Sequence, residues 1–327
     1  METVAFAILW LSLALYAVLA GADSGVGFWV LASRASSRAD ELRRDAFSYF
    51  SPLWEVNTLF LIFFLMGLFT AFAPALALLG RTLIPLVLAA LLLFVLRSAA
   101  YALLHHGPER WRPPATWVFG IASVGAGVLL GYAAAAPASG LITAEEFPAR
   151  YYASAVGIAS LPLALAASAH LAALVLAGYA HLNGRPSSEW FRVAAIATGL
   201  VALAAAALFT VAVLGQAPRT GERLLGSHAA LMLAAAASVV GGLAALGRRR
   251  YGVAALLTGV GYLLGLVEGA LAQLPYVVYP SLTLGEAASP TSSIAAFLLA
   301  TAIGGPLLIA AMVALYATTL RPVPREK

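Results

Sequence analysis

The chain consists almost entirely of long apolar segments separated by short polar connections. Apolar runs of about 20 residues or more span a bilayer as helices. The pattern predicts nine such helices, at about 4–33, 50–79, 82–105, 116–136, 153–181, 190–215, 227–247, 251–275 and 291–319. No connection is long enough for a soluble domain, so we expect residues 1–327 to form one all-α, polytopic membrane domain.

Basic residues divide unevenly between the two sets of connections. Fourteen lie after predicted helices 1, 3, 5 and 7 or in the C-terminal tail, four lie in the other connections, and Arg97 lies within a helix. Connections rich in Lys and Arg stay in the cytoplasm. We therefore expect the N-terminus outside and the C-terminus in the cytoplasm, with two four-helix groups and a peripheral ninth helix.

The composition excludes several kinds of site. Hydrophobic residues make up 62% of the chain and charged residues 10%, and there is no cysteine. Without cysteine, the chain forms no disulfide, thiolate-bound metal site, iron–sulfur cluster or covalently attached c-type haem. The sequence also lacks a phosphate loop, a dinucleotide fingerprint and a nucleophile–His–acid set, and we expect no nucleic-acid partner.

Three charged residues interrupt the apolar segments. Asp23 lies in the first predicted helix, Glu55 just inside the second and Arg97 in the third. A charge at membrane depth costs a few kcal/mol or more, so such residues usually mark a pathway or site. At 1.5 Å per residue the three lie at similar depth in the cytoplasmic half. They fit a proton relay tuned by Arg97, and the alternative is an ion pair that only holds three helices together.

Other residues in the predicted helices are weaker candidates for a functional site than these three charges. Gly21, Gly25 and Gly27 would allow close helix approach around Asp23. His170 could bind a haem or metal, but the absence of a second suitable ligand favours a packed, hydrogen-bonded histidine. Glu268 lies toward the outer end of the eighth predicted helix, where a water-exposed or partner-facing position competes with a functional one.

Four motifs follow one another along the chain. They are AGADSGVG at 20–27, PLWEVNTLFL at 52–61 with FTAFAP at 69–74, RSAAY at 97–101, and YPSLTLGEAASP at 279–290. In this order they resemble the patterns of subunit II of cytochrome bd-type quinol oxidases, which also has nine helices. The chain looks like a divergent member, because it departs from the family's patterns at Ala20, Ala22, Val56, Thr58 and Phe60.

The resemblance implies a haem-free subunit of a quinol:oxygen oxidoreductase in the prokaryotic plasma membrane. Two b-type haems, haem d and the quinol-oxidising site are expected in the partner, subunit I, and no cofactor or metal in this chain. Asp23, Glu55 and Arg97 match the family's intramembrane charges, with Trp54 and Asn57 as supporting residues. The chain would stabilise subunit I and line a cytoplasmic proton uptake path for oxygen reduction to water, and the resemblance leaves small accessory subunits open.

Two other functions remain open at the level of sequence. A proton-coupled secondary transporter could use Asp23 and Glu55 as coupling groups, although the inverted repeats and broken helices common in transporters are not evident. An assembly-only scaffold, in which the acids merely pair with Arg97, is the other.

Overall fold

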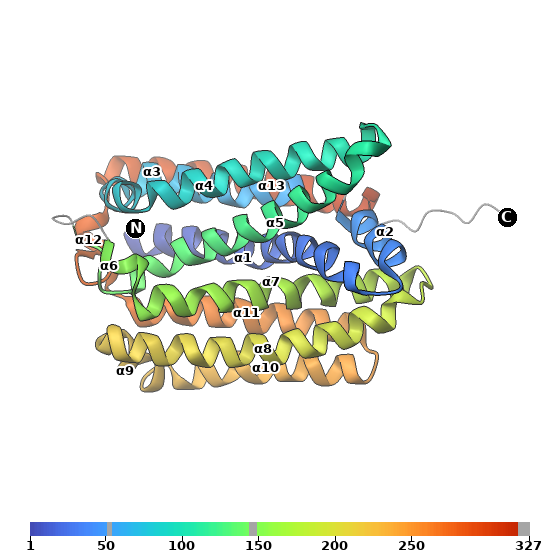
Figure 1. The fold of residues 1–327 in the computed structure, drawn as a ribbon. Helices are drawn as coiled ribbons and strands as arrows, with labels where there is room; N and C mark the ends of the chain where they lie inside the picture. Colours follow the sequence, from blue (N-terminus) through green and yellow to red (C-terminus); the bar gives the residue numbers. More distant parts are fainter. Residues whose placement is uncertain (51–53, 144–148, 320–327) are drawn as a thin grey trace.

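The computed structural model describes residues 1–50, 54–143 and 149–319, and long helices dominate it (Figure 1). The long helices are α1 (Glu2–Ala32), α3 (Trp54–Ala71), α4 (Ala73–His106), α5 (Arg112–Ala135), α7 (Ala155–Leu182), α8 (Ser187–Gln216), α10 (Ala229–Gly247), α11 (Tyr251–Gln273) and α13 (Thr291–Thr319). The short elements are η1 (Ser33–Ala35), α2 (Ala39–Phe50), η2 (Glu109–Trp111), η3 (Ala136–Ala138), α6 (Ala149–Tyr152), α9 (Pro218–Leu225), β1 (Tyr276–Val278), β2 (Leu282–Thr283) and α12 (Leu284–Ala287).

The expected all-helical membrane fold is confirmed. Within the described part of the chain, eight helices are long and apolar enough to cross a membrane. The apolar part of α3, Asn57–Ala71, is shorter than these eight. The count of nine spans, the two groups of four and the orientation of the termini stay predictions.

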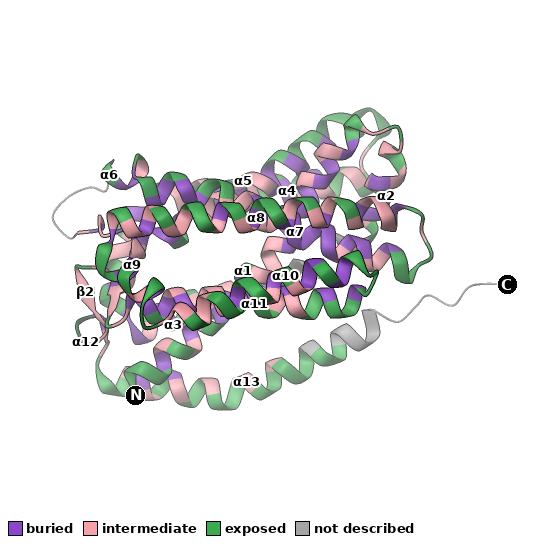
Figure 2. Ribbon diagram, turned by 90° about the horizontal axis from the view of Figure 1, so that it is seen from below, coloured by how far each residue is buried: buried purple, intermediate pink, exposed green. Residues whose placement is uncertain are grey.

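Helix α1 is the element around which the others pack. It contacts α3, α5, α7 and α11, which come from both halves of the sequence. The Trp10 and Trp29 indoles donate to the Leu266 and Ala169 carbonyls, each at 2.8 Å, and the Ser12 hydroxyl donates to the Phe60 carbonyl at 2.9 Å. At the edge of the bundle, by contrast, α13 is mostly exposed (Figure 2).

The boundary between the second and third predicted helices was wrong. The sequence analysis placed it at residues 80–81, whereas the structure breaks the helix at Phe72, with φ −141° and ψ 51°. Pro74 follows two residues later and has no N–H to donate within a helix. The Ala73 N–H donates instead to the Ser289 hydroxyl at 3.1 Å, so residues 73–79 belong to α4.

Two predicted connections contain structure of their own, at opposite ends of the bundle (Figure 1). Helix α2 buries Leu42 and Ala46, one turn apart, and exposes charged residues on its other side. At the other end, β1 and β2 pair antiparallel before α12. Thr283 and Glu286 form a capping box there, and the hydrogen bonds from the Thr283 hydroxyl and backbone N–H hold the pKa of Glu286 below its usual value.

Candidate functional site

Asp23 and Asn57 meet in the interior of the bundle, where α1 packs against α3. Asp23 is only 3% exposed and Asn57 is also buried. The Asn57 side-chain amide donates a hydrogen bond of 2.5 Å to Asp23 Oδ2. The other polar atom of Asn57, Oδ1, is buried without a hydrogen-bond partner among the described residues. Asn57 therefore satisfies one oxygen of Asp23 and has an acceptor to spare.

Arg97 supplies a positive charge to the same site. It is 4% exposed on α4, and its guanidinium carbon lies 5.2 Å from the centre of the Phe94 ring. Its positive charge lies near Asp23 and Tyr16. Asp23 and Arg97 each lie about 14 Å, at 1.5 Å per residue, from the ends of their helices at Ala32 and His106.

Tyr16 is a member of the site that the sequence analysis missed. It is buried on α1, two helical turns before Asp23. The signal was available, because residues seven apart in a helix lie on the same face. A tyrosine in an apolar helix is nevertheless a weaker signal than a charged residue, because its aromatic ring is apolar and is buried there without cost.

Two glycines bring neighbouring helices close to Asp23. A Cβ at Gly25 would lie 1.9 Å from the Ser168 carbonyl oxygen of α7, and one at Gly27 would lie 2.4 Å from Ser123 Cβ of α5. No other residue fits such contacts without moving a helix. The expected close approach around Asp23 is confirmed at these two positions, while a Cβ at Gly21 would meet side chains alone, the end of Leu171 at 3.2 Å and the Ser168 hydroxyl at 3.9 Å.

Two predicted site residues fall where the structure gives no side-chain description. Trp54 and Glu55 begin α3, and the described side chains of this helix start at Asn57. The side chain of Glu55 lies outside the described part of the chain, and its role stays a prediction.

A cavity of about 150 Å³ lies beside Asn57. Its walls come mainly from α1, α7 and α11, with Tyr49 from α2 and Asn57 from α3. The lining residues are Val18, Leu19, Ala22, Tyr49, Asn57, Leu171, Leu174, Val175, Ala255 and Gly259. At about 30 Å³ per molecule the cavity has room for a few waters, and Asn57 and Tyr49 are the lining residues with polar side chains.

His170 and Glu268 form no part of this site. His170 is a packed, hydrogen-bonded histidine, as the sequence favoured: Nδ1 lies 2.8 Å from the Ala195 carbonyl and the ring stacks on Tyr262 at 6.1 Å. Glu268 is only 5% exposed, so the water-exposed alternative was wrong. Among the described residues, no group of three or more His, Asp or Glu could hold a metal ion, and a metal-free chain stays a prediction.

Comparisons with known proteins agree with one another. A family model described as cytochrome bd terminal oxidase subunit II matches residues 1–319. A Bacillus subtilis (strain 168) protein named "Putative cytochrome bd menaquinol oxidase subunit II" is 23% identical over 299 residues, which cover 86% of this chain and 84% of that protein. A chain of the bd oxidase structure from Geobacillus thermodenitrificans superposes with a TM-score of 0.84 at 23% identity, covering 98% of both chains.

Proposed function

The chain belongs to the family of subunit II of cytochrome bd terminal oxidases, and from this premise we propose that it lines the proton uptake path of a quinol oxidase. Membership makes it a multi-pass subunit of a prokaryotic plasma-membrane complex, with subunit I as its partner and quinol as the substrate of the complex. The proposal concerns what this subunit does there: it stabilises subunit I and carries protons from the cytoplasm toward the site of oxygen reduction.

The end of the bundle that carries α2 is the cytoplasmic end in this proposal. Arginines gather in the α1–α3, α4–α5, α7–α8 and α10–α11 connections, all at this end (Figure 1). Basic connections remain on the cytoplasmic side. With α3 counted as a span, the chain crosses the membrane nine times and its N-terminus lies outside.

One observation carries the proton path most strongly: the buried carboxylate of Asp23 is hydrogen-bonded to a residue that lines a cavity. The Asn57 side-chain amide donates to Asp23, and the same residue lines the cavity. Water beside Asn57 would place a proton carrier within reach of a protonatable group in the membrane interior, which a relay requires. Arg97 offsets the cost of the negative charge on Asp23. Glu55, two residues before Asn57, is the proposed entry group, with Trp54 supporting it.

The proposal also keeps the two b-type haems and haem d in subunit I. The one histidine deep in this chain is poorly placed for a haem. Its ring packs between Tyr262 and Gly199, where even a Cβ would come within 2.7 Å of His170 Cε1. A haem needs an open face at its axial ligand, and this packing supports the haem-free assignment.

The test is quinol oxidase turnover of the assembled complex with Asp23→Asn. Asn keeps the size of the side chain and its contact with Asn57 but carries no titratable proton, and we expect turnover to fall by about tenfold or more, in line with the loss of one proton-transfer group. Asp40→Asn is the control, because the Asp40 side chain is 86% exposed on α2. Unchanged turnover with full haem content would refute the relay, and loss of haem or of subunit I would favour the assembly-only scaffold.

No observation favours the transporter over the oxidase subunit.

A further inference from the structure

Helix α2 supplies part of the wall of the cavity. It lies in the connection between α1, which carries Asp23, and α3, which carries Asn57. Near its end, Tyr49 lines the cavity beside Asn57. The placement of α2 therefore determines the shape of the cavity at the end that we assign to the cytoplasm.

Apolar contacts seat α2 on the bundle. Leu42 and Ala46 are fully buried in the main core with residues of α1, α7 and α8. The Phe47 ring lies 5.1 Å from the Phe119 ring of α5. These contacts press α2 against the bundle, but apolar packing is not directional, and polar contacts are what fix a side chain such as Tyr49 in one place.

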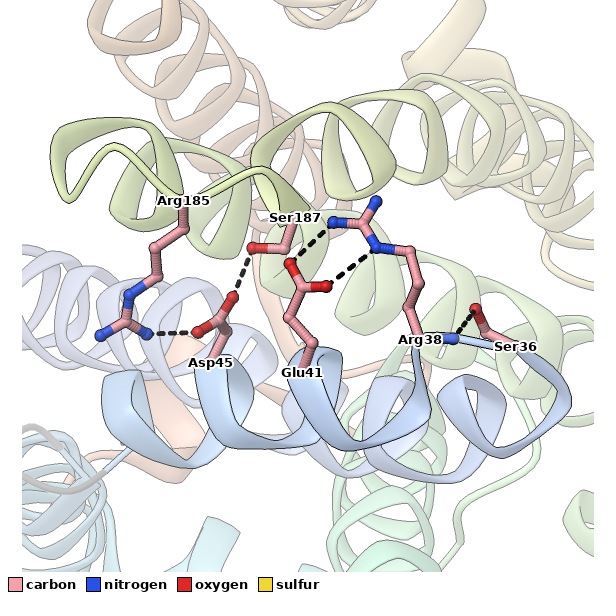
Figure 3. Close-up of polar contacts among 6 residues, drawn as sticks. All are labelled: Ser36, Arg38, Glu41, Asp45, Arg185 and Ser187. Atoms are coloured by element: carbon pink, nitrogen blue, oxygen red, sulfur yellow. Dashed lines mark hydrogen bonds and ion pairs between the residues drawn. The ribbon is translucent and has the colours of Figure 1, made fainter.

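Asp45 makes such polar contacts (Figure 3). It is 4% exposed and accepts hydrogen bonds from the Arg185 guanidinium, in the connection between α7 and α8, and from the hydroxyl of Ser187, the first residue of α8. One oxygen of Asp45 takes each donor, so the buried carboxylate is satisfied from a segment 140 residues away along the chain.

The same arginine links Asp45 to the cavity. The Arg185 guanidinium carbon lies 5.3 Å from the centre of the Tyr179 ring, and that ring lies 5.9 Å from the Tyr49 ring. Asp45 and Tyr49 are one helical turn apart on α2 and so share a face. Asp45, Arg185, Tyr179 and Tyr49 thus form a closed set of contacts between α2 and the end of α7.

A second ion pair on α2 has none of these properties. Arg43 and Asp40 bond to each other within the helix, and their side chains are 28% and 86% exposed. Such exposed pairs contribute little to structure. The two pairs on one short helix provide a matched comparison.

We propose that Asp45 is a positioning residue: by holding Arg185 and Ser187 it fixes Tyr49 in the cavity wall and limits the access of water to Asn57. This inference rests on the proposed function, because limiting the access of water matters only if protons enter here toward Asp23. Its geometry, however, can be tested without any turnover.

The experiment uses the absence of cysteine from the chain. Val18→Cys places one thiol in the cavity wall, and a membrane-impermeant maleimide added to the complex from the α2 side reports its access to water. In the Asp45→Asn background we expect this thiol to react about tenfold faster, the order expected from loss of one hydrogen bond to a charged group. Asp45→Glu should restore most of the slow rate, and Asp40→Asn should leave the rate unchanged.

Two further thiols separate a local effect from general loosening. Glu109→Cys, with a side chain 90% exposed, should react fast in every background, and Ala126→Cys, fully buried in α5, should stay unreactive. An unchanged rate at Val18→Cys overturns the proposal, as does equal acceleration by Asp40→Asn or a reactive Ala126→Cys. If Asp45→Asn prevents assembly, Ser187→Ala removes one donor and should give a smaller, about threefold, increase.

The outcome is independent of the test on Asp23. Unchanged turnover of the Asp23→Asn complex would refute the proton path and leave the maleimide result standing as a property of α2. Reduced turnover there, with no change in labelling by Asp45→Asn, would refute only the role of Asp45.

Discussion

Asp23 has three kinds of neighbour, and each makes a different contribution. Asn57 donates a hydrogen bond to one carboxylate oxygen, and the positive charge of Arg97 attracts the negative charge of Asp23. Gly25 and Gly27 let α7 and α5 approach so closely that no side chain intervenes. Partners of this kind lower the cost of burying a carboxylate, because an unpaired charge in the interior is very costly.

The close contact at Gly25, beside Asp23, predicts that a larger residue there lowers the stability of the protein. Gly25→Ala would place its Cβ 1.9 Å from the Ser168 carbonyl oxygen, so α1 and α7 must separate. We expect a loss of about 1–3 kcal/mol in unfolding free energy, as for overpacked cores, measured as a lower thermal midpoint of the purified complex.

Gly80→Ala is the matched control for this substitution. Gly80 lies inside α4 with nothing within 4 Å of its Cβ position. Alanine there should leave stability unchanged or raise it by about 0.5–1 kcal/mol, because glycine is a poor helix former. An equal loss at both glycines would contradict the close-contact explanation.

Sequence patterns predicted residues of this site when the signal was a charge in an apolar run. Asp23 and Arg97 were found in this way. The partners of Asp45 were not found, because Arg185 and Ser187 lie about 140 residues away and nothing local links them to α2. Contacts of this kind depend on the packing of the helices, which hydropathy does not specify.

At the scale of elements, the break between α3 and α4 depends on a distant segment. The Ser289 hydroxyl accepts from the Ala73 N–H at 3.1 Å, and the Ser289 N–H donates to the Ala71 carbonyl at 2.9 Å. Both backbone groups would otherwise lack partners at the ends of two helices. Pro74 is a local signal for this break, but Ser289 is 216 residues away from Ala73, and nothing in the sequence links the two.

This bridge predicts the effect of Ser289→Ala. The Ala73 N–H would lose its acceptor, with a cost similar to that of a helix cap, about 0.5–2 kcal/mol. Hydrogen exchange at the start of α4 should become faster, and the thermal midpoint of the complex should fall. Ser292→Ala, on the exposed first turn of α13, should change neither, and an equal effect of the two substitutions would argue against the bridge.

Helix α2 shows a local signal that a search for long apolar runs overlooks. Leu42 and Ala46 recur at helical spacing within a charged segment. Such a pattern predicts a short amphipathic helix. Its docking site on the bundle, in contrast, follows only from the structure.

At the scale of the whole molecule, the outer helices present apolar side chains outward. Leu88, Leu92 and Val95 of α4 are more than half exposed, as are Leu299 and Leu307 of α13. Large apolar surfaces of this kind face lipid or a partner subunit. The charged residues Asp23 and Arg97 instead lie buried in the interior, and this division agrees with a subunit that supports another chain and carries protons through its interior.

The most direct test of the proton path is the rate of proton uptake from the α2 side when the fully reduced complex reacts with oxygen in a single turnover. A pH-sensitive dye in the medium on that side reports the uptake. Asp23→Asn should slow it by about tenfold or more, while oxygen binding, which precedes proton transfer, keeps its normal rate. Proton uptake at the wild-type rate in Asp23→Asn would contradict the account.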